Sequence, residues 1–283
     1  MPVVTLLGTA QDGGRPQAGC QRNCCQNLGQ DEVQYPVSLG ICDDEGATHL
    51  VEATRALAEQ LKLWGHHDIS TVFLTHAHFG HVDGLGLFGR ETLNASGIRL
   101  FSSPLMANLL HETPHWKLML EQGVFLHTIL DPLHPLHLSA SLTVEAVSIP
   151  HRAELSDMQA YVFRGPSKSL LFLPDQDSWE ETLTYHHCED LRTWFSSIAV
   201  DIVLLDGTFW SVDELSVRLQ HEVPHPPVSE TISRLGHRRD GDPEVIFIHL
   251  NHTNPLHRRD ASERKLVEEA GWSIGEQGMQ FRL

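Results

Sequence analysis

Three histidines lie within six residues in the segment 74–84, LTHAHFGHVDG. His76 and His78 directly follow the apolar run Ser70–Leu74, which is typical of a buried strand. In extended backbone, alternate side chains point to the same face, so both imidazoles can converge on one ion, and His81 follows where the chain turns towards a helix. Neutral imidazole is a common ligand of zinc and similar metals. The segment predicts a metal site; the alternative is a histidine-rich loop in a chain with 20 histidines.

Three more potential ligands each follow an apolar run. His151 comes after residues 146–150, Asp175 after residues 169–174, and His249 after residues 245–248. Side chains at the ends of buried strands are held by a rigid scaffold and can meet in one cleft. Any one of them alone could be a cap or a solvated loop residue. Together with the histidine cluster, they favour a shared metal site.

The remaining pattern predicts sheets covered by helices in one domain spanning residues 1–283. Strands are predicted at Val3–Leu7, Val37–Ile41, His49–Val51, Thr71–Leu74, Ile98–Phe101, Leu142–Ile149, Gln159–Phe163, Ser169–Leu173, Ile202–Leu205 and Val245–His249. Helices are predicted at Thr54–Trp64, Val82–Leu93, Pro104–His111, Trp179–Phe195, Ser229–Leu235 and Ala261–Ala270. Residues 97–135 are predicted to form an insertion that shapes the pocket around the predicted metal site.

The composition narrows the class of partner. The chain has 283 residues, 41% of them hydrophobic and 20% charged, with a formal charge of −17. Nucleic acids and anionic membranes need a basic surface, so neither is expected as a partner. A bound cation could still attract a small anionic substrate locally. A homodimer is compatible with the sequence but is not implied by it.

Cysteine usage bears on the compartment. The five cysteines are an odd number, and Cys20, Cys24 and Cys25 are crowded together, which favours a metal clip in a reducing environment over a disulfide framework. Residues 1–8 lack the basic and long apolar segments of a signal peptide and predict a first strand. No run approaches the roughly 18 apolar residues of a membrane span. A cytoplasmic location is therefore expected.

The order His-x-His-x-x-His, then His, Asp and His, all at strand ends, resembles the metallo-β-lactamase superfamily. The resemblance implies an α/β fold, a four-layer αβ/βα sandwich with a dinuclear metal site at the edge shared by two mixed sheets. It implies that one divalent metal is held by three histidines, the second by two, and that an aspartate bridges both. The three histidines of the first metal would be His76, His78 and His151. The two of the second would be His81 and His249, and the bridging aspartate would be Asp175. Zinc is the first expectation, with manganese or iron as alternatives.

This chain departs from the common pattern at Gly80. The superfamily usually has His-x-His-x-Asp-His, and Gly80 stands where that Asp binds the second metal. The second metal would then keep only His81, Asp175 and His249, which predicts a weaker, more open or differently selective site. Asp83 lies nearby, but we expect it to cap the following helix, with metal binding as the alternative.

Two further segments resemble one branch of the superfamily, that of the B protein of pyrroloquinoline quinone biosynthesis and the cyclic phosphodiesterase of phosphonate breakdown. They are residues 7–17, LGTAQDGGRPQ, and residues 249–255, HLNHTNP. The resemblance implies a structural zinc held by Cys20, Cys24, Cys25 and His252, a known closed arrangement. The cysteine spacing is irregular, because Arg22 stands where the branch has its middle cysteine. Three reduced thiols in a loop are the alternative.

Two polar residues late in the chain also match this branch. The segment from His225, HPPVSE, resembles one whose histidine contacts a substrate phosphate or acts as general acid. A histidine that merely ends a loop is the alternative. Asp206 follows a buried run and is expected to orient a ligand histidine, and it is the rival of Asp175 as bridging ligand.

The residues and the resemblance together predict a metal-dependent hydrolase. A metal-activated hydroxide would attack a phosphodiester or related small anionic substrate, with Asp175 holding the nucleophile and His225 protonating the leaving group. One alternative is an iron-dependent oxidative enzyme like the quinone-biosynthesis B protein. Another is a metal-binding scaffold without catalysis, since fold alone does not establish activity.

Overall fold

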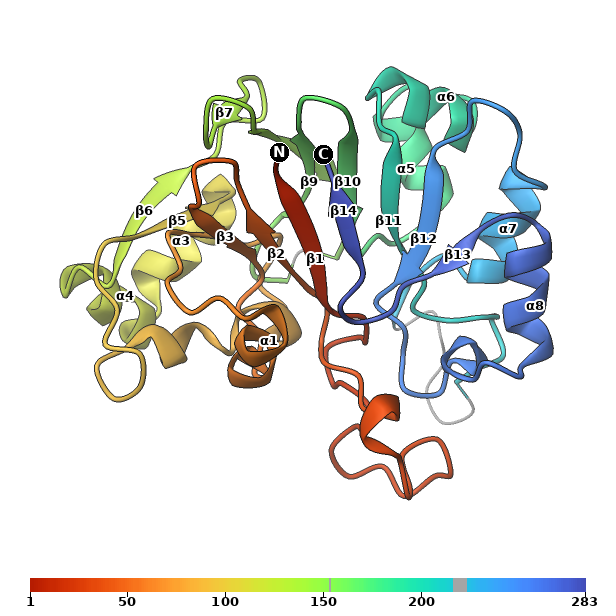
Figure 1. Cartoon of the computed structure of the whole chain (residues 1–283), viewed down its shortest axis with the longest axis horizontal. Helices are drawn as coiled ribbons and strands as arrows, with labels where there is room; N and C mark the ends of the chain where they lie inside the picture. Colours follow the sequence, from red (N-terminus) through yellow and green to blue (C-terminus); the bar gives the residue numbers. More distant parts are fainter. Residues whose placement is uncertain (153, 216–222) are drawn as a thin grey trace.

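The computed structural model describes residues 1–152, 154–215 and 223–283, and in these parts the chain forms two seven-stranded mixed sheets (Figure 1). The first sheet has the order β14-β1-β2-β3-β4-β5-β6. Its β14, β1, β2 and β3 are antiparallel, and β3 to β6 are parallel. The strands are β1 (Val3–Gly8), β2 (Ser38–Cys42), β3 (Thr48–Val51), β4 (Thr71–Phe73), β5 (Ile98–Ser102), β6 (Phe125–Ile129) and β14 (Gln280–Arg282).

The second sheet repeats this plan, with the order β13-β12-β11-β10-β9-β8-β7. Its β7 to β10 are antiparallel, and β10 to β13 are parallel. The strands are β7 (Leu136–His137), β8 (Thr143–Ile149), β9 (Met158–Arg164), β10 (Ser169–Leu173), β11 (Ile202–Asp206), β12 (Glu244–Ile248) and β13 (Ser273–Ile274). Parallel strands require crossover connections, and helices supply them here.

Helices cover the outer face of each sheet. On the first sheet they are α1 (Leu57–Trp64), α3 (Pro104–Glu112) and α4 (Pro114–Glu121), with the short α2 (Phe79–Val82) and η2 (Leu85–Phe88) beside them. On the second sheet they are α5 (Trp179–Tyr185), α6 (Leu191–Ser197), α7 (Val228–Leu235) and α8 (Ser262–Glu269). Short 3₁₀ turns are η1 (Gln30–Glu32) and η4 (Pro255–His257).

Three hydrophobic cores separate four layers. One core lies between the two sheets, and one lies under the helices on each outer face. Strand β10 shows how the sequence builds them: Leu170 and Phe172 join the inner core, whereas Leu171 and Leu173 join the outer one. Strands buried on both faces read as continuous apolar runs. The predicted αβ/βα sandwich is confirmed.

Most predicted strands are observed within one or two residues of their expected limits, but two helix predictions were wrong. The helix expected at 82–93 is instead α2 followed by η2, because Gly84 packs its Cα directly against the backbone of Thr54 and Ala53. The helix expected at 179–195 is divided into α5 and α6 by a turn in which His187 has a φ of 55°.

Residues 97–135 are not an insertion over the pocket. They form β5, α3, α4 and β6, and their apolar side chains pack into the outer core of the first sheet. The helix α4 and the strand β6 were not predicted. Within the described residues, no helix has both the length and the apolar character needed to cross a membrane.

Candidate metal centre

The predicted ligands come from segments that follow separate strands at one edge of the sandwich, and His81 among them lies in α2. His76, His78, His151 and Asp175 each offer a ligand atom, and these atoms lie within 4.8 Å of one another. The residues follow β4, β8 and β10. His78 Nδ1 lies 3.4 Å from His151 Nε2, and Asp175 Oδ1 lies 4.0 Å from the same nitrogen. The structure therefore brings together the whole first ligand group.

A second group shares Asp175 with the first. His81 Nε2 lies 3.3 Å from Asp175 Oδ2, and His249 Nε2 lies 3.5 Å from that oxygen. An unpredicted carboxylate completes the group, because Asp12 Oδ1 is 3.3 Å from His81 Nε2 and 3.4 Å from His249 Nε2. The sequence motif supplies no carboxylate besides Asp175 for this group, and the structure places Asp12 beside it. Asp12 lies on the N-terminal loop, far from the motif in sequence.

The other ring nitrogens of these histidines lie close to acids and hydroxyls. Glu52 Oε1 is 3.2 Å from His81 Nδ1 and accepts a 2.5 Å hydrogen bond from Thr75 Oγ1, which is in turn 2.9 Å from His76 Nδ1. The Glu52 side chain is fully buried. Such partners fix the tautomer and the orientation of metal-binding histidines. One carboxylate thus orients histidines of both groups.

Two further acids lie behind the rings of His151 and His249, one in direct contact and one through a hydroxyl. Asp177 Oδ1 lies 2.8 Å from His151 Nδ1. Asp206 Oδ1 accepts a 2.7 Å hydrogen bond from Thr208 Oγ1, which is 2.8 Å from His249 Nδ1. Asp206 therefore lies behind a histidine, and it belongs to none of the potential ligand groups found in the described residues. This arrangement agrees with the prediction that it orients a histidine.

Several atoms that face the centre are buried without a hydrogen-bond partner: His76 Nε2, His81 Nε2 and Asp175 Oδ2. Buried polar atoms are costly to leave unsatisfied. Burial holds the pKa of His76 well below its usual value, which keeps the ring neutral and able to bind a metal. Burial alone would raise the pKa of Asp175, but the surrounding histidines, His249 first, lower it well below its usual value. This donor set fits divalent metals.

Two of the six non-glycine residues with a positive φ in the described part of the chain lie at this centre. Glu52 has a φ of 68° and His249 a φ of 61°, in the left-handed region that non-glycine residues rarely adopt. Both residues directly follow a strand, β3 and β12 respectively. Strained backbone of this kind is characteristic of functional sites, where the surrounding structure fixes it.

His225 also faces the centre. It offers a ligand atom within 4.8 Å of those of Asp175 and His249, and its Nδ1 lies 2.7 Å from Asp206 Oδ2. Burial lowers the pKa of His225, but the charge and hydrogen bond of Asp206 outweigh it, so the pKa is raised. The prediction that His225 lies at the active centre agrees with this geometry.

A cavity of about 450 Å³ opens onto the first ligand group and is lined by His76, His78, Asp175 and His225 among others. This is the size of a small-molecule site. Phe79 and Leu155 line its wall and are 71% and 63% exposed. No residue from 97–135 lines it, contrary to the sequence prediction.

Asp83 does not perform the role predicted for it. It follows the last residue of α2 and forms a 2.9 Å ion pair with Arg55, so it is neither at the start of a helix nor directed towards the histidines. The reason is that the helix begins at Phe79, earlier than predicted.

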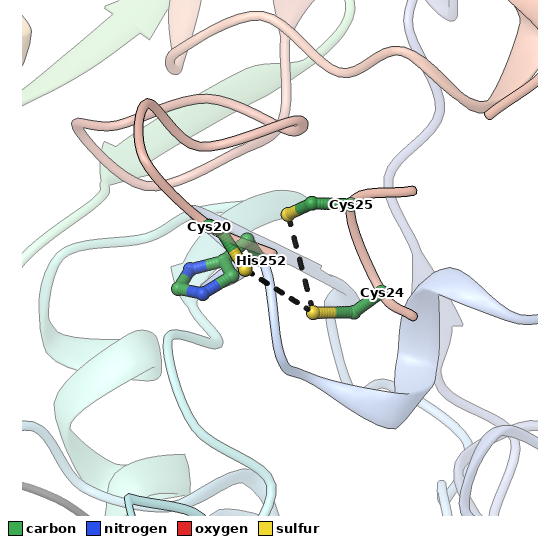
Figure 2. A group of neighbouring side chains, drawn as sticks. All are labelled: Cys20, Cys24, Cys25 and His252. Atoms are coloured by element: carbon green, nitrogen blue, oxygen red, sulfur yellow. Dashed lines mark hydrogen bonds between the residues drawn. The ribbon is translucent and has the colours of Figure 1, made fainter. Parts of the chain in front are cut away.

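The cysteine cluster forms a separate group. Cys20, Cys24, Cys25 and His252 each offer a ligand atom within 4.8 Å of the others (Figure 2). The Cys20–Cys24 and Cys24–Cys25 sulfur distances are both 3.9 Å. Zinc–sulfur bonds of about 2.3 Å separate two thiolates of a tetrahedral site by roughly 3.8 Å. Burial and the neighbouring thiols raise the pKa of Cys24 to about 12, so the three thiols ionise together only with a cation.

Comparison with known proteins identifies the class. The model of the β-lactamase superfamily domain matches residues 45–279, and the chain belongs to this superfamily of metal-dependent, generally hydrolytic proteins. It is similar to the coenzyme PQQ synthesis protein B of Xanthomonas campestris pv. campestris (strain B100), at 26% identity over 328 aligned positions covering 99% of each protein. The corresponding protein of Rhizobium meliloti (strain 1021) is also 26% identical, with 99% of this chain and 97% of the relative covered.

Two solved structures share the fold. Zn²⁺-bound PqqB from Methylobacterium extorquens has a TM-score of 0.78 at 19% identity, with 99% of this chain and 100% of that chain covered. A diphosphatase of the PhnP family has a TM-score of 0.70 at 19% identity, with 99% and 96% covered. The predicted superfamily is therefore confirmed, and these similarities agree with the predicted branch.

Proposed function

We propose that the protein is a metal-dependent hydrolase of phosphodiesters or related small phosphate esters. The observation that carries the proposal is the convergence of two ligand groups, linked by Asp175, with the His225–Asp206 pair beside the same cavity. The cavity has the size of a small-molecule site, and the chain's fold resembles that of a diphosphatase. A hydrolytic site needs a nucleophile, charge stabilisation and a proton donor, and this arrangement has candidates for each.

The first ligand group would hold one divalent metal through His76, His78 and His151, and the second another through His81 and His249, with Asp175 between them. Zinc suits these nitrogen and oxygen donors, and manganese or iron are alternatives. Such a pair supplies a water of lowered pKa and positive charge near the attacked phosphorus.

His225 would supply the proton for the leaving group. Its Nδ1 contacts Asp206, which leaves Nε2 as the nitrogen that can act towards substrate. Because its pKa is raised, more of the ring is protonated near neutral pH than in an ordinary histidine. Asp175, held ionised by the surrounding histidines, would orient the attacking water.

The test is release of p-nitrophenol from bis(p-nitrophenyl) phosphate by protein loaded with Zn²⁺, Mn²⁺ or Fe²⁺. We expect turnover that His78→Ala abolishes and His134→Ala preserves, because His134 is an exposed histidine paired with Asp131 away from the centre. Failure of all three metals to support turnover, or activity that survives His78→Ala, would overturn the proposal.

A second candidate function is an iron-dependent oxidation. It is favoured by the similarity to coenzyme PQQ synthesis protein B over nearly the whole chain. The group of Asp12, His81 and His249 is also a two-histidine, one-carboxylate set, which is typical of non-haem iron sites. Stoichiometric iron in the purified protein, with oxygen uptake and no ester hydrolysis, would support this function instead.

We also propose that Cys20, Cys24, Cys25 and His252 bind a structural zinc, and that the protein works in the cytoplasm. The five cysteines are free, and three adjacent thiols persist unoxidised most readily in a reducing compartment. The clip, defined as these four residues, would then fasten the N-terminal loop to the segment after β12.

A further inference from the structure

We propose that Asp12 is a ligand of the second metal and replaces the carboxylate that the motif lacks at Gly80. This inference rests on the proposal that the two ligand groups bind metals. It adds a residue from outside the motif, on the loop between β1 and β2, which projects from the lower edge of the sandwich in Figure 1.

Four atoms define the geometry. Asp12 Oδ1 and Asp175 Oδ2 each contact both His81 Nε2 and His249 Nε2, and the four distances range from 3.3 to 3.5 Å. Metal–ligand bonds of 2.0–2.2 Å separate neighbouring ligands of a tetrahedral ion by roughly 3.3–3.6 Å. Each of these four carboxylate–imidazole contacts therefore has the spacing of two neighbouring ligands of one metal.

Only one of these four contacts, His249 Nε2 to Asp12 Oδ1 at 3.4 Å, has the geometry of a hydrogen bond. His81 Nε2 and Asp175 Oδ2 approach to 3.3 Å, and yet both are buried atoms without a hydrogen-bond partner. The side chains of His81 and Asp175 are 1% and 2% exposed, so water does not readily satisfy them. Ligands aimed at a shared ion have this arrangement, because each lone pair points at the ion and none at another ligand.

Gly80 and Asp12 are coupled by packing. A Cβ at residue 80 would lie 2.4 Å from the Cα of Asp12 and 2.5 Å from its Cβ and Cγ. The N-terminal loop thus occupies the space into which a side chain at position 80 would project. Because residue 80 is a glycine, the loop can occupy this space, and the Asp12 carboxylate on the loop contacts His81 and His249.

The backbone holds Asp12 in this position. The Gln11 N–H donates to Leu250 O at 2.9 Å, and the Leu250 N–H donates to Thr9 O at 2.8 Å. Leu250 directly follows His249, so the segment 9–11 is paired with the chain beside a ligand. A short backbone pairing of this kind limits the movement of the Asp12 carboxylate relative to His249.

The experiment measures metal content and metal–metal coupling in the purified full-length protein and does not depend on turnover. Asp12→Asn preserves the shape of the side chain and removes its charge, and Asp12→Ala is a second variant. Asp83→Asn is the matched control, since Asp83 is a nearby carboxylate that pairs with Arg55. Each protein is reconstituted with Mn²⁺ and examined by electron paramagnetic resonance and by titration, and circular dichroism verifies that each is folded.

We expect a spin-coupled Mn²⁺ pair in the wild type and in Asp83→Asn. Both Asp12 variants should give the signal of single ions and a second binding step weakened at least tenfold. A coupled pair in folded Asp12→Asn and Asp12→Ala overturns the proposal, as does a wild type that binds one Mn²⁺ at this centre. An intact Mn²⁺ pair without ester hydrolysis would instead contradict the proposed function and leave the role of Asp12 standing.

Discussion

Replacing Gly80 by alanine tests whether the N-terminal loop is packed against the histidine motif as tightly as the structure indicates. The added methyl carbon would lie 2.4–2.5 Å from three atoms of Asp12, whereas ordinary contacts are 3.4–4 Å. One of these atoms is the Cα, so a change of rotamer at Asp12 cannot relieve the overlap. The loop must move by roughly 1 Å, and overpacking of this kind costs about 1–3 kcal/mol.

Helix propensity acts in the opposite direction, because alanine is favoured over glycine within a helix by up to about 1 kcal/mol. Gly86 provides a control for this effect. It lies in η2 six residues away, and a Cβ there would meet no atom within 4 Å. The difference between Gly80→Ala and Gly86→Ala therefore isolates the overlap with Asp12.

The expected difference can be stated as a melting temperature. At about 2.1 cal/mol/K per residue, unfolding of 283 residues has an entropy of roughly 0.6 kcal/mol/K. A cost of about 1–3 kcal/mol then lowers the melting temperature of Gly80→Ala by roughly 2–5 °C relative to Gly86→Ala. Displacement of Asp12 should also reduce bound metal. Calorimetry and elemental analysis measure the two effects, and equal melting temperatures with equal metal content would refute the packing argument.

Three other predictions concern the proton donor and the clip. Replacing His225 by glutamine should lower kcat for esters with poor leaving groups by about 10²–10⁴-fold and affect p-nitrophenyl esters less, and equal losses for both substrate classes would contradict a general acid. Asp206→Asn should move the basic limb of the kcat/KM pH profile to lower pH, because burial lowers the pKa of His225 and Asp206 is the largest of the acids that raise it, ahead of Asp175 and Asp12. An unmoved limb would count against this pairing. Cys24→Ser should remove about one equivalent of zinc that Cys188→Ser retains, as measured by mass spectrometry of the metals.

The part of the centre that could be predicted is the part that local sequence encodes. His76, His78, His151 and Asp175 each follow a recognisable apolar strand, so their position at a sheet edge could be inferred before their contacts were known. The superfamily resemblance then supplied their grouping. The sandwich itself was predictable for the same reason, since strands buried on both faces leave a strong apolar signal.

The residues that escaped prediction depend on contacts distant in sequence. Asp12 lies 237 positions from His249, and nothing in residues 9–14 indicates that pairing. Glu52 follows a four-residue strand and reads as an ordinary surface acid, although it is fully buried beneath His81 and Thr75. The helix expected at 82–93 failed because Gly84 is fitted against the chain at Thr54 and Ala53, which apolar periodicity does not reveal.

The N-terminal loop has a consequence for how the protein matures. The same loop carries Asp12 and the three cysteines of the clip, and the fourth clip residue, His252, lies three positions after His249. A zinc in the clip would tie together the two segments that deliver Asp12 and His249, before either has an ion to hold. If both proposals hold, loss of the clip zinc should loosen the segments that carry Asp12 and His249 and weaken binding of the second metal. The supply of zinc for the clip would then limit how much of the protein retains the second metal of the centre.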